Sequence, residues 1–259
     1  MRPQLPCWLA LTALLLLPLQ AWAAEQPAQL RLCSEEEDAY PWVMRDRPGL
    51  NVIMMRMVEK QLSLPIRITP LPWKRCMALV GTGEMDGLFK ISFARDRMEL
   101  GVYPMSGDKP DATRRMLDES YSLYRLKGSK LEWDGTTIRH ASLPIGVQPG
   151  FSIAAQLAAM GLKLDEGVRS TDENFQKLLL GRVSGVALQS QRGDTSIESR
   201  PEFRARIERV EPPLVSKPYF LMLSKPFVGK YPAYAQKIWN SVAAVRESPE
   251  YKAEMQQFK

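Results

Sequence analysis

The chain has 259 residues, of which 45% are hydrophobic and 25% are charged, and its formal net charge at pH 7 is +6. This length is sufficient for one large domain or two small lobes with a buried hydrophobic core. The lysines and arginines are dispersed and form no long basic block, so the charge indicates a solvated surface and nucleic-acid binding is not expected.

The N-terminus has the pattern of a secretory signal peptide. Arg2 supplies the positive start, residues 9–19 form an apolar run too short to span a bilayer comfortably, and residues 21–23 are a small-x-small cleavage site. We therefore predict that residues 1–23 are a signal peptide and that the mature chain is exported, most simply to a bacterial periplasm. The alternative is a retained membrane anchor. No later segment is apolar enough to cross a membrane.

The first half of the exported chain alternates between predicted strands and predicted helices. Strands are expected at 29–33, 66–71 and 85–89, and helices at 50–57 and 73–80. Glycines follow the second helix, because glycine takes the left-handed dihedrals of a helix end without penalty. This βαβαβ order predicts an α/β fold class, with helices packed on a parallel sheet.

A weaker copy of the helix–glycine–strand pattern appears later in the chain. Gly83 and Gly87 correspond to Gly181 and Gly185, and apolar strand residues follow each pair. The repeat indicates two similar α/β lobes. In this second unit we predict strands at 144–147 and 183–188, helices at 152–160 and 175–180, and a capping-box pair at Ser170 and Glu173.

Two extended segments bracket the second α/β unit. Residues 121–127 lead out of the first lobe and residues 218–225 lead back, which predicts a two-stranded hinge. The chain then ends in a helix with apolar residues on one face. We therefore predict a discontinuous first lobe formed by residues 24–120 and 220–259, and a second lobe formed by residues 121–219.

Two cysteines remain after removal of the signal peptide, Cys33 and Cys76. Cys33 ends the first predicted strand, and Cys76 lies in the first turns of the helix after the second strand. Both places lie along the same sheet edge of an open α/β lobe, so a disulfide is geometrically possible in an oxidising compartment. Two buried free thiols are the alternative.

Four stretches resemble the bacterial solute-binding proteins of family 3, which serve polar amino-acid ABC importers. They are DAYPW, PWKRCMALVGTGEMDGLF with the following ARDR, LPIGVQPGFS, and LLLGRVSGVALQ. The resemblance covers nearly all of the mature chain. It implies the bilobed periplasmic-binding-protein type II fold, in which two parallel-sheet lobes are joined by two crossover strands and close on a small ligand.

The resemblance implies an arginine that grips the ligand's carboxylate just beyond the third strand, and Arg97 occupies that place. A guanidinium suits this role because its fork meets a carboxylate with two parallel hydrogen bonds. Arg95 is the alternative partner, and a solvated loop arginine is the alternative role.

In the second lobe the resemblance implies an anion contact at the turn before a helix, here residues 148–152. Free backbone N–H groups at a helix start favour an anion, and Ser152 can add its hydroxyl beside Phe151. Ser152 as a simple N-cap is the alternative, and the two roles are compatible.

The resemblance also implies an aromatic residue over the ligand from the loop after the first strand. Tyr40 and Trp42 are the candidates, because a large flat ring can stack on a ligand and exclude water. Packing against the lobe's own core is the alternative for both. Trp73 begins an amphipathic stripe, so we expect it in the core.

Some positions depart from the family pattern. Gln189 stands where an acidic residue usually holds the ligand's ammonium, Ser184 replaces an aspartate, and Lys90 lies beside the predicted cleft. A lysine there disfavours a cationic ligand, so these changes point to an anionic or amide-bearing compound. The acidic run 35–38, with Glu36 near the expected cleft, could instead bind an amine or form a solvated rim.

The resemblance implies a binding protein that captures a carboxylate-bearing amino acid or related compound and delivers it, as a monomer, to an inner-membrane ABC permease. A sensory protein that presents its ligand to a membrane receptor is the second hypothesis. A dehydratase-like enzyme on the same fold is the third. We expect no enzyme activity, cofactor or metal, because His140 is the chain's single histidine and lies in a polar loop.

Overall fold

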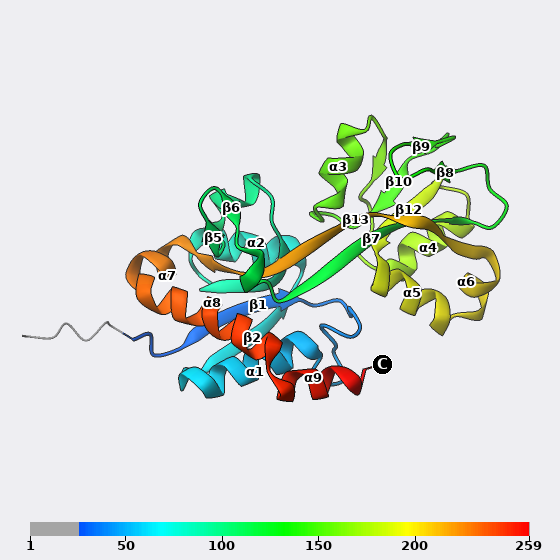
Figure 1. Ribbon diagram of the computed structural model, residues 1–259. Helices are drawn as coiled ribbons and strands as arrows, with labels where there is room; N and C mark the ends of the chain where they lie inside the picture. Colours follow the sequence, from blue (N-terminus) through cyan, green and yellow to red (C-terminus); the bar gives the residue numbers. More distant parts are fainter. Residues whose placement is uncertain (1–25, 259) are drawn as a thin grey trace, which may run out of the picture.

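The computed structural model describes residues 26–258, so the predicted signal peptide at residues 1–23 lies outside the described residues. Two α/β lobes are joined by two long strands, β7 (Leu117–Leu126) and β13 (Ile207–Ser224), as Figure 1 shows. This arrangement confirms the predicted two-lobed α/β fold. Within residues 26–258, no helix combines the length and the hydropathy that crossing a membrane requires.

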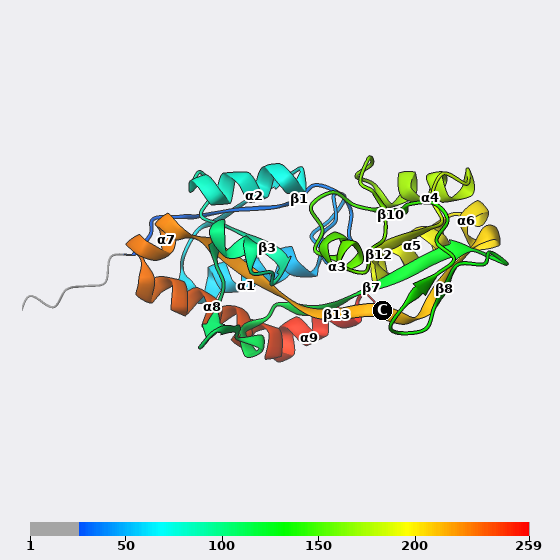
Figure 2. The ribbon, with the colours of Figure 1, turned by 90° about the horizontal axis from the view of Figure 1, so that it is seen from above.

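The first lobe is built on the parallel strands β2, β1 and β3, with Leu30 opposite Ile66 and Leu32 opposite Gly87. Helix α2 covers one face of this sheet, whereas α1 and the C-terminal helix α8 (Pro232–Glu247) cover the other (Figure 2). The elements that precede β7 are β1 (Leu30–Glu35), α1 (Leu50–Leu62), β2 (Ile66–Leu71), α2 (Trp73–Thr82), β3 (Gly87–Ser92), η1 (Asp96–Glu99), β4 (Gly101–Val102), β5 (Met105–Ser106), β6 (Lys109–Pro110) and η2 (Ala112–Arg114).

Strand β3 lies further along the chain than the predicted 85–89. Asp86 stays outside the strand because its carboxylate accepts hydrogen bonds from the backbone and the guanidinium of Arg31, at 2.7, 3.1 and 2.8 Å. Pairing with β13 then extends β3 as far as Ser92, which lies opposite Tyr219. The shift moves Lys90 and Ser92 out of the expected loop and into the sheet.

The second lobe contains the parallel strands β11, β10 and β12, with Ile145 opposite both Leu164 and Gly185. The capping box ahead of α4 is confirmed, because Ser170 Oγ accepts from the Glu173 backbone N–H at 3.1 Å. The elements of this lobe are β8 (Glu132–Trp133), β9 (Ile138–Arg139), β10 (Ile145–Val147), α3 (Ile153–Ala159), β11 (Leu164–Asp165), α4 (Thr171–Leu179), β12 (Gly185–Gln189), α5 (Ser190–Ser199) and α6 (Pro201–Arg206).

Helices α5 and α6 were not predicted from the sequence. Residues 190–199 carry too few apolar side chains for a visible helical period. The position of α5 depends on a close contact between Gly193 and the ring of Tyr124, which the sequence does not reveal. A Cβ at Gly193 would lie 2.4 Å from that ring. Glycine therefore lets α5 pack directly on β7.

Strands β7 and β13 run antiparallel, from the pair Leu126–Ile207 in the second lobe to the pair Leu117–Tyr219 in the first. β7 also pairs with β12, and β13 with β3, so one nine-stranded sheet passes through both lobes. Both predicted hinge segments are found, but β13 begins well before residue 218. The lobe boundaries expected at 120/121 and 219/220 fall inside these two strands.

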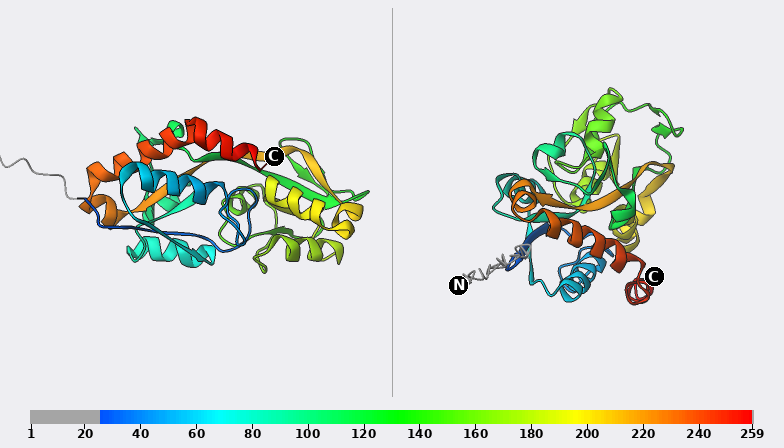
Figure 3. Two further views of the ribbon diagram at one scale, coloured as in Figure 1. Left: turned by 90° about the horizontal axis from the view of Figure 1, so that it is seen from below. Right: turned by 60° about the vertical axis from the view of Figure 1, so that its left-hand side comes forward.

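The C-terminal segment returns to the first lobe as α7 (Lys225–Lys230), α8 (Pro232–Glu247) and α9 (Pro249–Gln256). Helices α8 and α9 pack along α1 (Figure 3). The last described residues reach the loop after β1, where Tyr40 donates a hydrogen bond to the Phe258 carbonyl at 2.7 Å. This loop is therefore held in place by the far end of the chain.

Cys33 and Cys76 form a disulfide, with their Cα atoms 5.7 Å apart. Both side chains are fully buried, in the cluster of apolar residues between α2 and the sheet. The bridge connects the C-terminal part of β1 to α2. It therefore ties Glu35 and Trp73, which flank the gap between the lobes, to one rigid unit.

We predict that replacing both cysteines by serine lowers the free energy of unfolding by about 2–4 kcal/mol, because the unfolded chain regains the freedom of the closed loop. Equilibrium urea unfolding of the oxidised protein measures this loss. The matched control is the unmodified protein unfolded under reducing conditions, which should lose a similar amount, whereas reductant should not affect the double variant. Equal stability of all samples would contradict the prediction.

Candidate ligand-binding site

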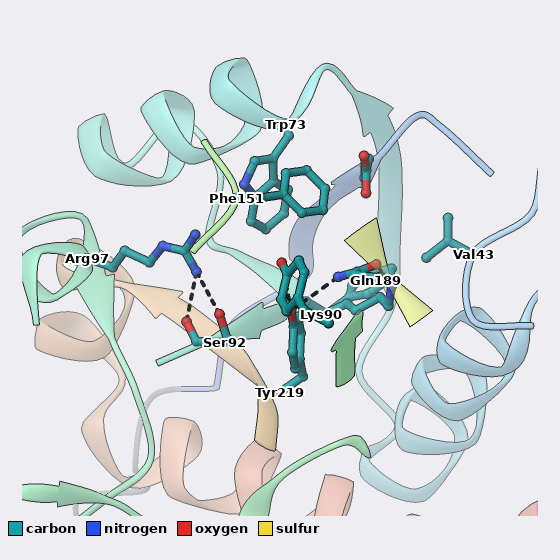
Figure 4. Close-up of a pocket in the computed structure, with 11 residues that line it drawn as sticks. Val43, Trp73, Lys90, Ser92, Arg97, Phe151, Gln189 and Tyr219 are labelled. Atoms are coloured by element: carbon teal, nitrogen blue, oxygen red, sulfur yellow. Dashed lines mark hydrogen bonds between the residues drawn. The ribbon is translucent and has the colours of Figure 1, made fainter. Parts of the chain in front are cut away.

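A pocket lies between the lobes, where the parallel strands of each lobe end. Figure 4 shows Arg97 entering from one side, Lys90 and Gln189 on the other, and Trp73 with Phe151 across from Tyr219. Its walls therefore come from the first lobe, the second lobe and the crossover strands. The free volume is about 20 Å³, room for roughly one water molecule, so a small organic ligand fits only if the lobes separate. The lining residues are Glu35, Val43, Trp73, Phe89, Lys90, Ser92, Arg97, Tyr121, Phe151, Gln189 and Tyr219.

Arg97 is buried and bridges the two lobes. It lies in the short η1 turn after β3, and its Nη1 donates to the carbonyl and the hydroxyl of Ser92 at 2.9 and 3.1 Å. Its Nη2 donates to the Gly150 carbonyl of the second lobe at 2.9 Å. Gly150 has a φ of +83°, a conformation that favours glycine, and this turn presents its carbonyl to the first lobe.

The hydroxyl of Ser152 contacts Ser92 of the first lobe instead of capping α3. Although Ser152 occupies the N-cap position, its side chain makes no capping hydrogen bond. Its Oγ lies 2.8 Å from Ser92 Oγ and accepts from Lys217 Nζ at 3.3 Å. The preceding Phe151 packs against Trp73, with ring centroids 6.2 Å apart. The 148–152 turn thus meets the first lobe through both polar and aromatic contacts.

Lys90 occupies a β-bulge in β3. Two residues of β3, Phe89 and Lys90, face the single residue Leu221 of β13, since the register shifts between Phe220 and Met222. Lys90 has a φ of 59°, a left-handed conformation that costs a non-glycine residue roughly 1–2 kcal/mol. A bulge redirects the local side chain, and here it directs Lys90 into the pocket. Such strain is often found at functional positions.

Lys90 is only 8% exposed and has polar partners from the second lobe and from β7. Its Nζ donates to Gln189 Oε1 at 2.7 Å and lies 3.5 Å from Glu119 Oε2. Burial lowers the pKa of Lys90 to about 8, and the negative charge of Glu119 partly opposes this shift. Gln189 in turn donates to the Tyr219 hydroxyl at 3.2 Å, so its amide is engaged at both ends.

A buried ion pair also connects the lobes. Arg192 of α5 donates to both carboxylate oxygens of Glu35, at the end of β1, at 3.1 and 2.7 Å. The side chains are 4% and 12% exposed, respectively. Burial opposes the charge of Arg192, but the Glu35 carboxylate raises its pKa overall. The guanidinium also lies 5.7 Å from the centroid of the Phe151 ring.

Among the residues predicted from the sequence, the structure brings Arg97, Lys90, Phe151 and Gln189 together in the pocket wall, with Ser152 directly behind them. Trp73 was expected in the core; it contacts core residues but also lines the pocket, and its Nε1 donates to the Gly150 carbonyl at 3.3 Å.

The other predicted residues lie elsewhere. Tyr40 is bonded to Phe258, Trp42 packs against the core of the first lobe, and Arg95 is exposed. Glu36 lines an outer groove, while its neighbour Glu35 lines the pocket. Each of these four positions is outside the pocket wall.

Several residues in the pocket wall or in contact with it were not predicted at all. Ser92 was assigned to a loop, Arg192 lies in a segment without helical period, and Glu119 and Lys217 lie on the crossover strands. Glu119 and Lys217 are directly opposite each other in the β7–β13 ladder. The two residues just precede the predicted hinge segments 121–127 and 218–225, which is a signal that the sequence contains, although in the structure Glu119 contacts Lys90 and Lys217 contacts Ser152. Within residues 26–258, no group of His, Cys, Asp or Glu is placed to hold a metal ion.

No model of a known protein family matches this sequence, and no curated protein does. Solved structures do match it. An ancestral arginine-binding protein bound to arginine has a TM-score of 0.72 at 16% identity, covering 90% of this chain and 99% of that one. A candidate binding component of an ABC transporter from Wolinella succinogenes, complexed with lysine, has a TM-score of 0.71 at 14% identity, covering 90% and 96%.

A histidine kinase sensor domain with similarity to periplasmic binding proteins also matches, with a TM-score of 0.71 at 13% identity, covering 89% of this chain and 95% of that one. At such identities the likeness shows the fold alone. The chain therefore has the two-lobed fold of the periplasmic binding proteins, with its pocket between the lobes.

The lowered pKa of Lys90 predicts a specific pH dependence of stability. The folded-state value of about 8 lies below the ordinary value of 10.5, so between these pH values the unfolded chain binds a proton that the folded chain does not. The free energy of unfolding should therefore rise with pH across this window, by at most about 3 kcal/mol.

The reference for this measurement is the variant that combines Lys90→Met with Glu119→Gln, because it leaves no buried carboxylate unpaired. Urea unfolding of both proteins at several pH values across the window isolates the contribution of Lys90. As the pH rises, the unfolding free energy of the unmodified protein should increase relative to that of the double variant. Parallel curves would show that Lys90 keeps an ordinary pKa.

The Glu35–Arg192 pair predicts that the lobes are held together electrostatically. Glu35→Gln leaves the Arg192 guanidinium buried without a counter-ion, and breaking a buried pair in this way costs about 3–5 kcal/mol. Because the pair spans the lobes, the variant should open and show a larger radius of gyration by small-angle X-ray scattering. Glu208→Gln, which breaks a pair with Arg125 inside the second lobe, is the matched control. Equal radii for both variants would contradict the prediction.

Proposed function

We propose that this protein is a periplasmic solute-binding protein. In this proposal it captures a small polar ligand that bears a carboxylate between its lobes and delivers the ligand to an inner-membrane ABC importer. The observation that carries the proposal is the pocket whose polar walls come from both lobes and from the crossover strands. A ligand in such a pocket contacts both lobes at once, so it stabilises the closed arrangement.

The proposed mechanism uses the β7–β13 ladder as a hinge. In the open form Arg97 and Lys90 of the first lobe are exposed to solvent, together with Phe151 and Gln189 of the second. The ligand's carboxylate binds Arg97 first and then replaces the Gly150 carbonyl as its partner when the lobes close. The closed shape is then what a permease would recognise.

A sensory protein that presents its ligand to a membrane receptor is the second candidate function. The structural likeness to a histidine kinase sensor domain supports it, and both functions use the same pocket and the same closure. Capture of membrane proteins by the closed, ligand-bound protein distinguishes the two functions. Recovery of a permease complex would support import, and recovery of a receptor kinase would support sensing.

The proposed function is tested by a thermal-shift screen of the exported chain after removal of bound small molecules. The panel contains amino acids, keto acids, dicarboxylates, polyamines and short peptides. A compound at 100 times its dissociation constant stabilises the folded protein by about 2.7 kcal/mol, which raises the melting temperature measurably. Absence of any stabilising compound would count against a solute-binding function.

For a ligand that the screen identifies, Arg97→Ala should lower the affinity at least tenfold, because a hydrogen bond to a charged group contributes about 1.5–3 kcal/mol. Isothermal titration calorimetry measures the effect. Arg95→Ala is the matched control, since this exposed arginine is two positions earlier in the same loop and should leave the affinity unchanged. A loss confined to Arg95→Ala would move the carboxylate contact to that residue.

A further inference from the structure

Two cations lie at one edge of the pocket without a carboxylate partner, Arg97 in its wall and Lys217 next to that wall. Arg97 donates only to Ser92 and to the Gly150 carbonyl, and Lys217 Nζ donates to Ser152 Oγ at 3.3 Å. Within the described part of the chain, neither Arg97 nor Lys217 forms an ion pair. This edge of the pocket therefore carries two uncompensated positive charges.

These two charges act on each other. Burial lowers the pKa of the half-buried Lys217, and the positive charge of Arg97 lowers it further. Like charges held together in a partly buried site are unfavourable unless an anion joins them. Ser92 Oγ donates to Ser152 Oγ at 2.8 Å, so the two hydroxyls connect the two cations, and the Ser152 hydroxyl can donate to such an anion.

The carboxylates at the pocket are already paired. Glu35 forms a bidentate ion pair with Arg192, and Glu119 lies 3.5 Å from the ammonium of Lys90. An ammonium group on a ligand would therefore find no free carboxylate among the described pocket residues. The positive charges of Lys90, Arg97 and Lys217 would repel such an ammonium.

The outer groove does not reverse this balance. It contains Glu36 and Glu37, but it is also lined by three cations, Lys74, Arg75 and Arg169. Counting Glu35, which also lines this groove, three carboxylates stand against three cations there, so the groove has no excess of negative charge that would attract an ammonium.

We propose that the ligand is an organic acid without an amino group, and that Lys217 binds its carboxylate together with Arg97. The inference rests on the proposed function and adds the chemical class of the ligand and a specificity-determining residue. The carboxylate oxygens replace the Gly150 carbonyl and the Ser152 hydroxyl as partners of the two cations. An α-amino acid of the same shape brings an ammonium that the pocket cannot neutralise, so it is discriminated against.

Matched pairs of ligands test this class directly by isothermal titration calorimetry. The pairs are 2-oxoglutarate with L-glutamate, malate with L-aspartate, and 4-methyl-2-oxopentanoate with L-leucine, whose members differ in bearing an oxo or hydroxyl group or an ammonium. In each pair that binds, the organic acid should bind at least tenfold more tightly, roughly the effect of one charged contact.

Lys217→Gln tests the residue. It should weaken binding of the organic acid at least tenfold and bring the affinity ratio within the pair closer to one, an effect that loss of packing alone would not produce. Lys60→Gln, on the exposed end of α1, is the matched control and should leave both affinities and their ratio unchanged.

The outcomes separate the two proposals. Equal or tighter binding of the amino-acid member would overturn the inference while the solute-binding function stands. Tight binding of a neutral or cationic compound from the wider panel would do the same. An unchanged ratio in Lys217→Gln would remove Lys217 from the site. If no compound in the pairs or in the panel binds, the proposed function fails and the inference fails with it.

Discussion

The antiparallel ladder between β7 and β13 is the constraint on which the rest of the structure depends. Both strands pass through both lobes, so they determine the distance and the direction in which the lobes can approach each other. The ladder also carries Glu119, Tyr121, Lys217 and Tyr219 into the gap. The ladder therefore supplies one side of the pocket as well as the connection between the lobes.

Polar groups on this side of the pocket hold the walls in a defined arrangement. The Tyr219 hydroxyl accepts a hydrogen bond from Gln189 and donates one to Tyr121. The negative charge of Glu119 partly opposes the lowering of the Lys90 pKa by burial. Lys90 reaches this network only because a bulge in β3 places it in a left-handed conformation. Strained backbone positions are often found at functional sites, and this one places Lys90 in the pocket wall.

The distribution of charge gives the pocket two different ends. At one end each buried cation has a carboxylate, as in Glu35–Arg192 and Lys90–Glu119. At the other end, Arg97 and Lys217 share only hydroxyl and carbonyl oxygens. In the function proposed above, the Glu35–Arg192 pair holds the lobes together and the unpaired end binds the ligand's carboxylate, so closure and selectivity depend on separate groups of residues.

The sequence by itself determined the α/β class, the order of most elements and the two-lobed plan, because apolar periodicity and glycine positions are local properties of the chain. The tertiary structure alone decided the extent of β3, the bulge at Lys90 and the existence of α5, since these depend on pairing with β13 and on the contact of Gly193 with Tyr124. It also decided that Tyr40 contacts Phe258 and that Glu35 faces Arg192. Such partners are 157 or more positions apart in the chain, and only folding brings them together.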